Sequence, residues 1–312
     1  MGKTALLFPG QGSQYVGMGK TLADAYPAAR LIFESADQAL GFSVSRLCIE
    51  GSEADLRLTE NTQPALLTVS IAAFTVLREL GVRPDYVAGH SLGEYSALVA
   101  AGSLRFTDAL RLVRKRGRFM QQAVPPGLGA MAALLKLPPG RLEQVLRDSA
   151  QGEVVSAANL NAPDQVVIAG HTGAVNRAID LAKAAGARRA VLLAVSAPFH
   201  CPLMKPAQEQ MAPALNANVF DDLDWPLINN WQAGEIRTAS DARDGLIEQI
   251  PNTVLWEQTI RHLAAQGVDR FFEVGPGGVL TGLLRSIDPS LQGIKFGEAA
   301  DVEKLHLAVA SH

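Results

Sequence analysis

Gly89-His90-Ser91-Leu92-Gly93-Glu94-Tyr95 is the stretch around which the rest of the chain is organised, and it matches the pattern G-x-S-x-G. Residues 86–88 before it have the character of a short buried strand, and residues 92–101 after it that of a helix rich in Leu, Ala and Val. Strand, sharp turn and helix are the setting of a nucleophile elbow, where glycines flank the serine because the turn is strained. A chance Gly-Ser turn is the competing interpretation, and this setting disfavours it. We predict that Ser91 is an acyl-accepting nucleophile and that the N–H of Leu92 donates to a developing oxyanion.

The composition limits the class of protein. A chain of 312 residues with 48% hydrophobic residues is enough for one large domain or two unequal ones. The net charge of −3 does not indicate a nucleic-acid-binding surface. The two cysteines, Cys48 and Cys201, lie far apart, which argues against a disulfide framework and fits a reducing cytoplasm. The sequence shows no signal peptide, membrane-spanning run or metal-ligand pattern, so we expect a cytoplasmic protein without bound metal.

A glycine-rich loop follows the first predicted strand, residues 4–8. It reads Pro9-Gly10-Gln11-Gly12-Ser13-Gln14 and is neither a dinucleotide fingerprint, because Tyr15 stands where Gly is needed, nor a P-loop. Ligands of open α/β sheets collect at the carboxyl ends of the strands, where this loop and the elbow converge. The N–H of Gln11 is therefore a candidate second oxyanion donor. An ordinary turn between strand and helix is the alternative.

The helix predicted over residues 107–123 carries an arginine on its apolar side. Arg116 falls among Ala109, Leu112, Phe119 and Met120 at 100° per residue. A buried guanidinium cannot lose its charge and needs an anionic partner, either a structural Asp or Glu or a substrate carboxylate. Periodicity leaves these two alternatives open. The other basic side chains share the outer face, which is a solvated surface or a docking site for an acidic partner: Arg111, Arg114, Lys115 and Arg118.

A compact lobe is predicted after the break at Pro125-Pro126-Gly127. Its segments alternate as β-α-β-β-α-β, the ferredoxin-like pattern, over residues 129–136, 139–150, 154–158, 165–169, 173–185 and 188–195. We expect Asn159 and Asn161 in the turn at its middle, where asparagine is common for backbone reasons. The fold predicted is α/β, with residues 1–124 and 198–312 forming a large domain and residues 125–197 a small subdomain.

The large domain is completed by further segments. Helices are expected over residues 21–40, 61–80 (with Gln63-Pro64 in the first turn), 242–250 and 256–266. Strands are expected over residues 226–229 and 270–274, and the glycine-rich turn 275–278 leads into a last helix.

A serine nucleophile needs a base, and the chain has six histidines. His200 is the best candidate because it lies in a loop bounded by Pro198 and Pro202, where the chain re-enters the large domain. The side chain of His90 is expected to point away from Ser91. The others lie in less suitable places: His171 in a hairpin, His262 and His306 on surface-like helices and His312 at the terminus. No acid completes a triad convincingly, Asp269 and Glu273 being the nearest by pattern, so a backbone carbonyl is the alternative.

These motifs together resemble the acyltransferase family of fatty acid and polyketide synthesis, and within it the malonyl-CoA:acyl carrier protein transacylases. The order and spacing agree over essentially the whole chain for the glycine-rich loop 10–14, the elbow 89–95, Arg116, Phe199-His200 and residues 273–277. The resemblance implies a hydrolase-like α/β core with a parallel sheet and a ferredoxin-like insert. It also implies transfer of malonyl from coenzyme A through a malonyl-serine intermediate to the phosphopantetheine thiol of a carrier protein.

The resemblance assigns roles to individual residues. Ser91 is the nucleophile, His200 the base, and Gln11 and Leu92 the oxyanion hole. Arg116 grips the malonyl carboxylate, and the backbone carbonyl of Gln249 orients the histidine. Phe199 is typical of malonyl-selective members. Thr253, where the family often has Pro, is a departure that could shift the loop carrying Gln249. The predicted substrate pocket comprises Arg116, Gln63, Phe199, Met120, Asn159 and Asn161.

Other functions are compatible with parts of this sequence. A serine esterase or thioesterase is expected to have a clear acid as third member of the triad and no buried arginine. A binding subunit without catalytic activity would not need Ser91, His200 and Arg116 together. A transferase serving a polyketide synthase or a malonate decarboxylase uses the same chemistry and stays open. We expect a coenzyme A thioester as substrate, no permanently bound cofactor, a carrier protein acting in trans, no nucleic acid or membrane partner, and a monomer.

Overall fold

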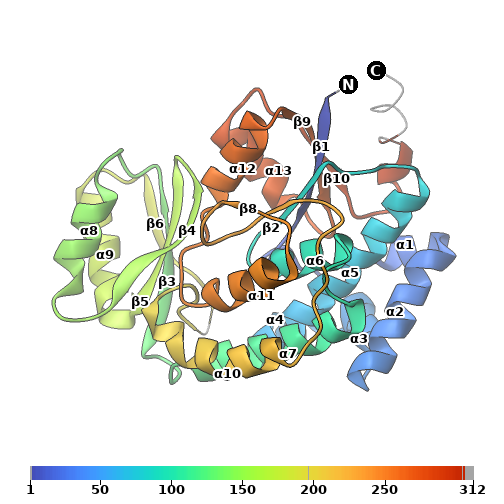
Figure 1. The fold of residues 1–312 in the computed structure, drawn as a ribbon. Helices are drawn as coiled ribbons and strands as arrows, with labels where there is room; N and C mark the ends of the chain where they lie inside the picture. Colours follow the sequence, from blue (N-terminus) through green and yellow to red (C-terminus); the bar gives the residue numbers. More distant parts are fainter. Residues whose placement is uncertain (1, 196, 304, 306–312) are drawn as a thin grey trace.

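Two separate sheets organise the computed structural model, which describes residues 2–195, 197–303 and 305. The larger has six strands in the order β10-β9-β1-β2-β7-β8, and the smaller has four in the order β4-β5-β3-β6. In Figure 1 the smaller sheet stands to the left of the larger. The chain is thus an α/β protein with a mixed, mainly parallel sheet and a separate antiparallel one.

The larger sheet is buried on both faces. Its strands are β1 (Lys3–Phe8), β2 (Tyr86–Gly89), β7 (Leu227–Ile228), β8 (Glu235–Ile236), β9 (Val268–Val274) and β10 (Gly293–Phe296). Neighbours run parallel except for β7 and β8. Along β1, Leu6 and Phe8 enter one apolar core while Ala5 and Leu7 enter another. The continuous apolar runs in this sheet are what a parallel sheet covered by helices on both sides requires.

Helices cover the two faces unequally. On one side lie α12 (Trp256–Ala265) and α13 (Val279–Ile287); on the other lie α5 (Thr59–Glu79), α6 (Leu92–Ala100) and α7 (Phe106–Gln122), as Figure 1 shows. The second side is thickened by α1 (Lys20–Ala25), α2 (Pro27–Leu40), α3 (Val44–Glu50), α4 (Glu53–Arg57), the 3-10 turn η1 (Pro202–Met204), α10 (Lys205–Asn216) and α11 (Ala239–Glu248). The elbow between β2 and α6 therefore lies at the carboxyl end of a central strand, covered by helices.

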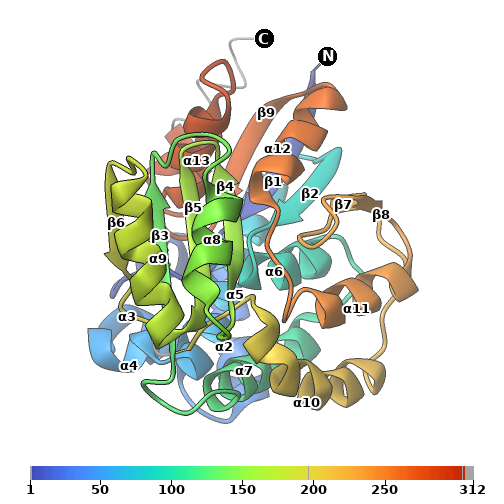
Figure 2. The same ribbon diagram turned by 90° about the vertical axis from the view of Figure 1, so that its left-hand side faces the viewer.

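The smaller sheet has its own core. Its strands β3 (Gly129–Leu135), β4 (Val155–Ala162), β5 (Gln165–His171) and β6 (Arg189–Leu192) pair antiparallel throughout. Figure 2 shows α8 (Leu142–Ala150) and α9 (Thr172–Ala184) side by side on one face, where they bury an apolar cluster against the sheet. The observed element order β-α-β-β-α-β is the one that the sequence predicts.

Two helix predictions were wrong in detail. Residues 21–40 form two helices, because Tyr26 is extended (φ −123°, ψ 116°) ahead of Pro27, and proline disfavours a helical conformation in the residue before it. The helix expected from residue 61 begins at Thr59, so Pro64 lies inside it and not in its first turn.

The predicted central turn of the small lobe was also misplaced. Asn159 and Asn161 lie in β4, which continues to Ala162, so the turn to β5 comprises residues 163–164. The pairing of β4 with β5 shifts register between Ala157 and Asn159 and again after Leu160. Such irregularities reorient individual side chains along a strand, and they break the alternation from which a strand is recognised in a sequence.

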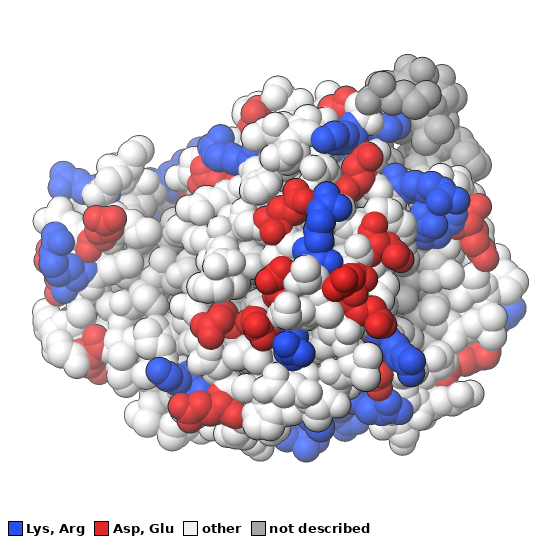
Figure 3. All heavy atoms as spheres, viewed as in Figure 1, with Lys and Arg blue, Asp and Glu red and all other residues white. Residues whose placement is uncertain are grey.

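Charged side chains of both signs lie on the surface. Figure 3 shows acidic and basic side chains interspersed over one face of the molecule. Within the described ranges no helix is long and apolar enough to cross a membrane, and no group of three or more His, Cys, Asp or Glu is placed to hold a metal ion.

Candidate active site

Ser91 occupies a strained turn between β2 and α6. Its backbone angles are φ 50° and ψ −104°, in the region that non-glycine residues rarely adopt. A Cβ on Gly89 would lie 2.0 Å from the backbone of Gly93, and one on Gly93 would lie 2.0 Å from the carbonyl oxygen of Phe8. Both positions therefore require glycine, and the tight turn places Ser91 at the pocket with the N–H of Leu92 in the first turn of α6.

His200 is placed to act on the serine. Its Nε2 lies 2.7 Å from Ser91 Oγ, and its Nδ1 lies 2.9 Å from the backbone carbonyl oxygen of Gln249, the C-cap residue that follows α11. Because a carbonyl oxygen only accepts, Nδ1 carries the ring proton and donates it there. Nε2 is thus left free to accept the serine proton.

Neither acid considered from the sequence meets His200. The Glu273 carboxylate accepts hydrogen bonds from the backbone N–H groups of Leu280 and Thr281 and so caps α13. The Asp269 carboxylate lies against Gly2. The carbonyl of Gln249, the alternative to an acid, is the group found at the histidine.

Arg116 is buried, 1% exposed, as its place on the apolar side of α7 predicts. Its Nη1 donates to Gln63 Oε1 at 3.1 Å, and its Nη2 donates to Gln249 Oε1 at 2.8 Å and to Ser91 Oγ at 3.1 Å. The guanidinium also lies 5.7 Å from the ring centre of Tyr95. Its hydrogen-bond partners among the described residues are neutral, so the buried positive charge beside Ser91 Oγ has no anionic group in direct contact.

Burial and the neighbouring positive charge keep the His200 imidazole deprotonated. Burial, and after it the Arg116 guanidinium, lowers the pKa of His200 to about 3. Only a neutral imidazole can accept the serine proton, so the site is held in its reactive protonation state at neutral pH.

A cavity of about 220 Å³ opens above these groups. Nearly all site residues predicted from the sequence line it: Gln11, Gln63, Ser91, Leu92, Arg116, Met120, Asn159, Asn161, Phe199 and His200. Gln249 is not among the lining residues, but its side chain accepts a hydrogen bond from Arg116 and its backbone carbonyl accepts one from His200. The arrangement brings a serine hydroxyl, a neutral imidazole and a fixed cation into one small volume, which Gln11 and Leu92 also line.

Further residues at the pocket were not singled out from the sequence. His90 lines the cavity, and its Nε2 lies 2.8 Å from Asn161 Oδ1. The small lobe contributes Gln165 as well, and apolar residues from both lobes close the walls: Met131, Val167, Leu193, Val195, Val279, Leu280 and Leu283.

A polar network beneath the elbow was also missed. Asn230 Oδ1 accepts the N–H of Ser91 at 2.7 Å, and its Nδ2 donates to the carbonyl oxygen of Gly89 at 2.7 Å. Glu94 Oε2 accepts the backbone N–H of Asn230 at 3.0 Å. Asn230 comes just after β7, so the rule that ligands gather at the carboxyl ends of parallel strands could have indicated it.

Thr253 joins the two lobes. Its Oγ1 donates to the carbonyl oxygen of Ala157 at 2.7 Å, and Val254 exchanges backbone hydrogen bonds of 2.9 Å with Ala158 and Leu160 of β4. The segment following Gln249 is therefore fixed to the small lobe, and the departure from the family's proline supplies an additional hydrogen bond there.

The other predicted features lie outside the pocket. His171 Nδ1 accepts the N–H of Val154, and His262 lies 3.0 Å from the carbonyl oxygen of Ala233. His306 and His312 lie outside the described residues. The basic face of α7 forms a shallow hollow with Ala39 and Leu40, in which Arg114 lies over the ring of Phe42 at 4.2 Å.

Several known proteins are similar to this chain in sequence and in architecture. The profile of the acyl transferase domain matches residues 5–302. The chain is 48% identical to the malonyl CoA-acyl carrier protein transacylase of Bacillus subtilis over 310 residues, 99% of this chain and 97% of the relative. An acyl carrier protein S-malonyltransferase from Vibrio cholerae superimposes with a TM-score of 0.95 at 45% identity, covering 97% of this chain and 99% of the other.

A second solved structure includes a partner. It is a malonyl-transacylase in complex with a holo acyl carrier protein of a type II polyketide synthase, with a TM-score of 0.94 at 44% identity, covering 97% of this chain and 98% of that one. Because the profile spans almost the entire chain and the relatives match along their whole length, this chain belongs to the acyl transferase domain family.

Proposed function

We propose that this chain is a malonyl-CoA:acyl carrier protein transacylase that supplies extender units for fatty acid biosynthesis. Ser91 takes the malonyl group from coenzyme A and passes it to the phosphopantetheine thiol of a holo acyl carrier protein in a ping-pong reaction. The observation that carries this function is the buried Arg116 guanidinium 3.1 Å from Ser91 Oγ. It supplies the partner that a free carboxylate on the acyl group needs.

The chemistry proceeds in two similar halves. His200 Nε2 removes the proton of Ser91 as its oxygen attacks the thioester carbonyl, and the N–H groups of Gln11 and Leu92 stabilise the oxyanion. The imidazolium then gives its proton to the departing coenzyme A sulfur, which leaves a malonyl ester on Ser91. In the second half the carrier thiol attacks this ester, and the same groups act in reverse.

Selection rests on charge and shape. The malonyl carboxylate pairs with Arg116, which Gln63 and Gln249 hold in position. An acetyl group would enter the same pocket without pairing the buried cation, so it is disfavoured. Phe199 and Met120 limit the width beside the acyl chain, while Asn159 and Asn161 of β4 offer amides to the thioester arm.

Several wider features belong to this proposal. A coenzyme A thioester is the substrate, and no permanently bound cofactor is needed. The division into residues 1–124 with 198–312 and residues 125–197 follows the two sheets, and the elbow on a parallel sheet supports a hydrolase-like core. Cys48 and Cys201 are both free and buried, which fits a reducing cytoplasm, and a monomer is part of the proposal.

More than one class of carrier protein is a candidate acceptor of the malonyl group. The solved complex of a related transacylase with a type II polyketide carrier protein supports an acceptor of that kind as well. A malonate decarboxylase system would use the same loading chemistry. Comparing rates with purified holo carrier proteins from each class separates these alternatives.

Intact-protein mass spectrometry tests the proposed function. Mixing the enzyme with malonyl-CoA should add one malonyl group, and holo carrier protein should remove it much faster than water does. The Ser91→Ala variant should gain nothing. Discharge by water at the same rate as by carrier protein would instead indicate a thioesterase.

A further inference from the structure

Glu94 is a fully buried carboxylate to which the transfer reaction described above gives no role. It lies on α6, one turn after Ser91, and none of its surface is exposed. Its Oε2 accepts two hydrogen bonds, from the backbone N–H of Asn230 at 3.0 Å and from Gln249 Nε2 at 2.9 Å. Its Oε1 is buried beside Gly245 of α11 and has no hydrogen-bond partner among the described residues.

A single side-chain amide connects Glu94 to Arg116. The Nε2 end of Gln249 donates to Glu94 and to the carbonyl oxygen of Ser91, while its Oε1 end accepts from Arg116 Nη2. The carboxylate accepts only, so it fixes which end of the amide faces the guanidinium. Among the described residues Arg116 forms no direct ion pair with a carboxylate, and Glu94 is thus placed to balance its charge through Gln249.

Loading the enzyme disturbs this balance. In the free site, one buried cation faces one buried carboxylate. A malonyl ester on Ser91 brings a second carboxylate to Arg116, so two anions would then share one cation away from water. Like charges in a buried site favour protonation of one of them.

We propose that Glu94 is the exchangeable counter-charge of Arg116. In mildly alkaline solution it is ionised in the free enzyme, takes one proton from solvent when malonyl occupies Ser91, and returns that proton when malonyl leaves. This inference rests on the proposed function, because only a dicarboxylic acyl group brings the second anion.

The proton balance of the loading step is simple. The serine proton leaves with the coenzyme A thiol, and the additional proton on Glu94 comes from solvent with no change of oxidation state. Burial raises the pKa of Glu94 to about 7, although its hydrogen bonds with Gln249 and Asn230 and the charge of Arg116 lower it. Pairing Arg116 with the substrate weakens the last of these and raises the pKa further.

Neighbouring titratable groups must be considered as alternative proton acceptors. Burial raises the pKa of the Tyr95 hydroxyl, so this group stays protonated in both states. Burial and Arg116 lower the pKa of His200, and burial lowers that of His90, so both histidines are neutral in the free enzyme. Neutralising Arg116 would also raise the pKa of His200, which makes it the main competitor of Glu94.

Proton uptake during stoichiometric loading tests the inference. The enzyme is mixed with malonyl-CoA in weak buffer at about pH 8 with a pH indicator, and the ester formed is counted by intact mass in the same sample. We expect uptake approaching one proton per malonyl ester. The loading equilibrium should also shift towards the malonyl-enzyme as pH falls, by up to about tenfold per pH unit above the pKa of Glu94.

Two variants separate charge from structure. Glu94→Gln keeps the size and the acceptor oxygen but cannot take up the proton, so its ester should form with almost no uptake and with little dependence on pH. Glu273→Gln is the matched control, because Glu273 is also buried but caps α13 away from Arg116. It should keep the uptake of the unchanged enzyme.

Infrared difference spectroscopy of the unchanged enzyme with ¹³C-labelled glutamate gives a result that does not depend on how Glu94→Gln folds. A labelled carboxylic acid band should appear on loading. Ester formation without uptake and without this band would overturn the inference, and so would full uptake persisting in Glu94→Gln, which would point to His200. Absence of any ester would instead refute the proposed function on which the inference rests.

Discussion

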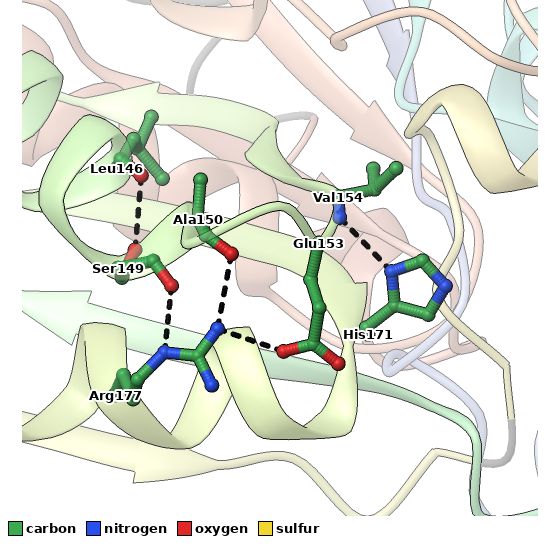
Figure 4. A network of polar contacts seen from close by, with 7 residues as sticks. All are labelled: Leu146, Ser149, Ala150, Glu153, Val154, His171 and Arg177. Atoms are coloured by element: carbon green, nitrogen blue, oxygen red, sulfur yellow. Dashed lines mark hydrogen bonds and ion pairs between the residues drawn. The ribbon is translucent and has the colours of Figure 1, made fainter.

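Two arginines, one in each lobe, differ in the groups that surround the same side chain. Arg177 of α9 donates to the carbonyl oxygens of Ser149 and Ala150 and to the Glu153 carboxylate, as Figure 4 shows. Arg116 has only neutral oxygens as direct partners and faces a cavity.

The two arginines differ in whether their charge is already paired with a carboxylate or is left for a ligand to pair. Arg177 stabilises the end of α8, because a cation is favoured where the last carbonyls of a helix are exposed, and a carboxylate already balances its charge. The charge of Arg116 is balanced only at a distance, so an incoming carboxylate gains a direct partner. The same contrast holds for His171, which accepts one backbone N–H, and His200, which contacts the nucleophile.

The largest effect is expected at the histidines. His200→Ala removes the general base and should slow malonyl loading by about 10⁴-fold or more. His171→Ala removes only an acceptor for Val154 and should load at nearly the normal rate. Stopped-flow release of coenzyme A measures both, and equal losses in the two variants would contradict the assignment of the base.

The arginine in the pocket should control selectivity. Arg116→Ala should reduce the preference for malonyl over acetyl by about 10²- to 10³-fold, because a charge-assisted bidentate pair is lost and the pocket no longer penalises an uncharged acyl group. Loading rates with the two thioesters measure this ratio. Arg177→Ala is the control, and its ratio should stay unchanged.

The arginine in the small lobe should instead affect stability. Arg177→Ala removes hydrogen bonds to two carbonyls and a partly exposed ion pair, so we expect the free energy of unfolding to fall by about 1–2 kcal/mol. Urea denaturation measures the change. An undiminished free energy of unfolding together with altered selectivity would reverse the roles given to the two residues.

The smallest change is expected in the pH dependence of the reactivity of Ser91. The pKa of His200 lies far below its usual value, so the imidazole stays neutral, and competent as a base, until the pH falls towards about 3. Inactivation of Ser91 by an uncharged sulfonyl fluoride should therefore vary by less than about twofold between about pH 5 and 8. A fall in rate centred near pH 6.5 would indicate an ordinary, unshifted histidine.

Local sequence patterns were sufficient to predict the positions of site residues that lie on or next to regular helices and strands. The elbow around Ser91 follows from glycines that its backbone requires, and the burial of Arg116 follows from helical periodicity. The order of the small lobe followed from alternating patterns, whereas its turn was misplaced because the register shifts in β4 break the alternation at Asn159.

Contacts between distant segments could not be predicted in this way. Asn230 and Glu94 meet beneath the elbow across 136 positions of sequence, and no local pattern encodes that meeting. Gln249 was indicated only by resemblance to a family, since a backbone carbonyl carries no sequence signal. In contrast, the break between the two helices at Tyr26 could have been predicted from the proline that follows it.

One competition experiment tests the central claim that Ser91 carries a malonyl group selected by Arg116. The enzyme is mixed briefly with equal concentrations of malonyl-CoA and acetyl-CoA, quenched in acid and digested, and the modified peptides are identified by mass spectrometry. We predict that the peptide containing Ser91 carries malonyl almost exclusively, and that the same peptide of Arg116→Ala carries both groups in similar amounts. Equal labelling of Ser91 by the two groups in the unchanged enzyme, or malonyl on another residue, would contradict it.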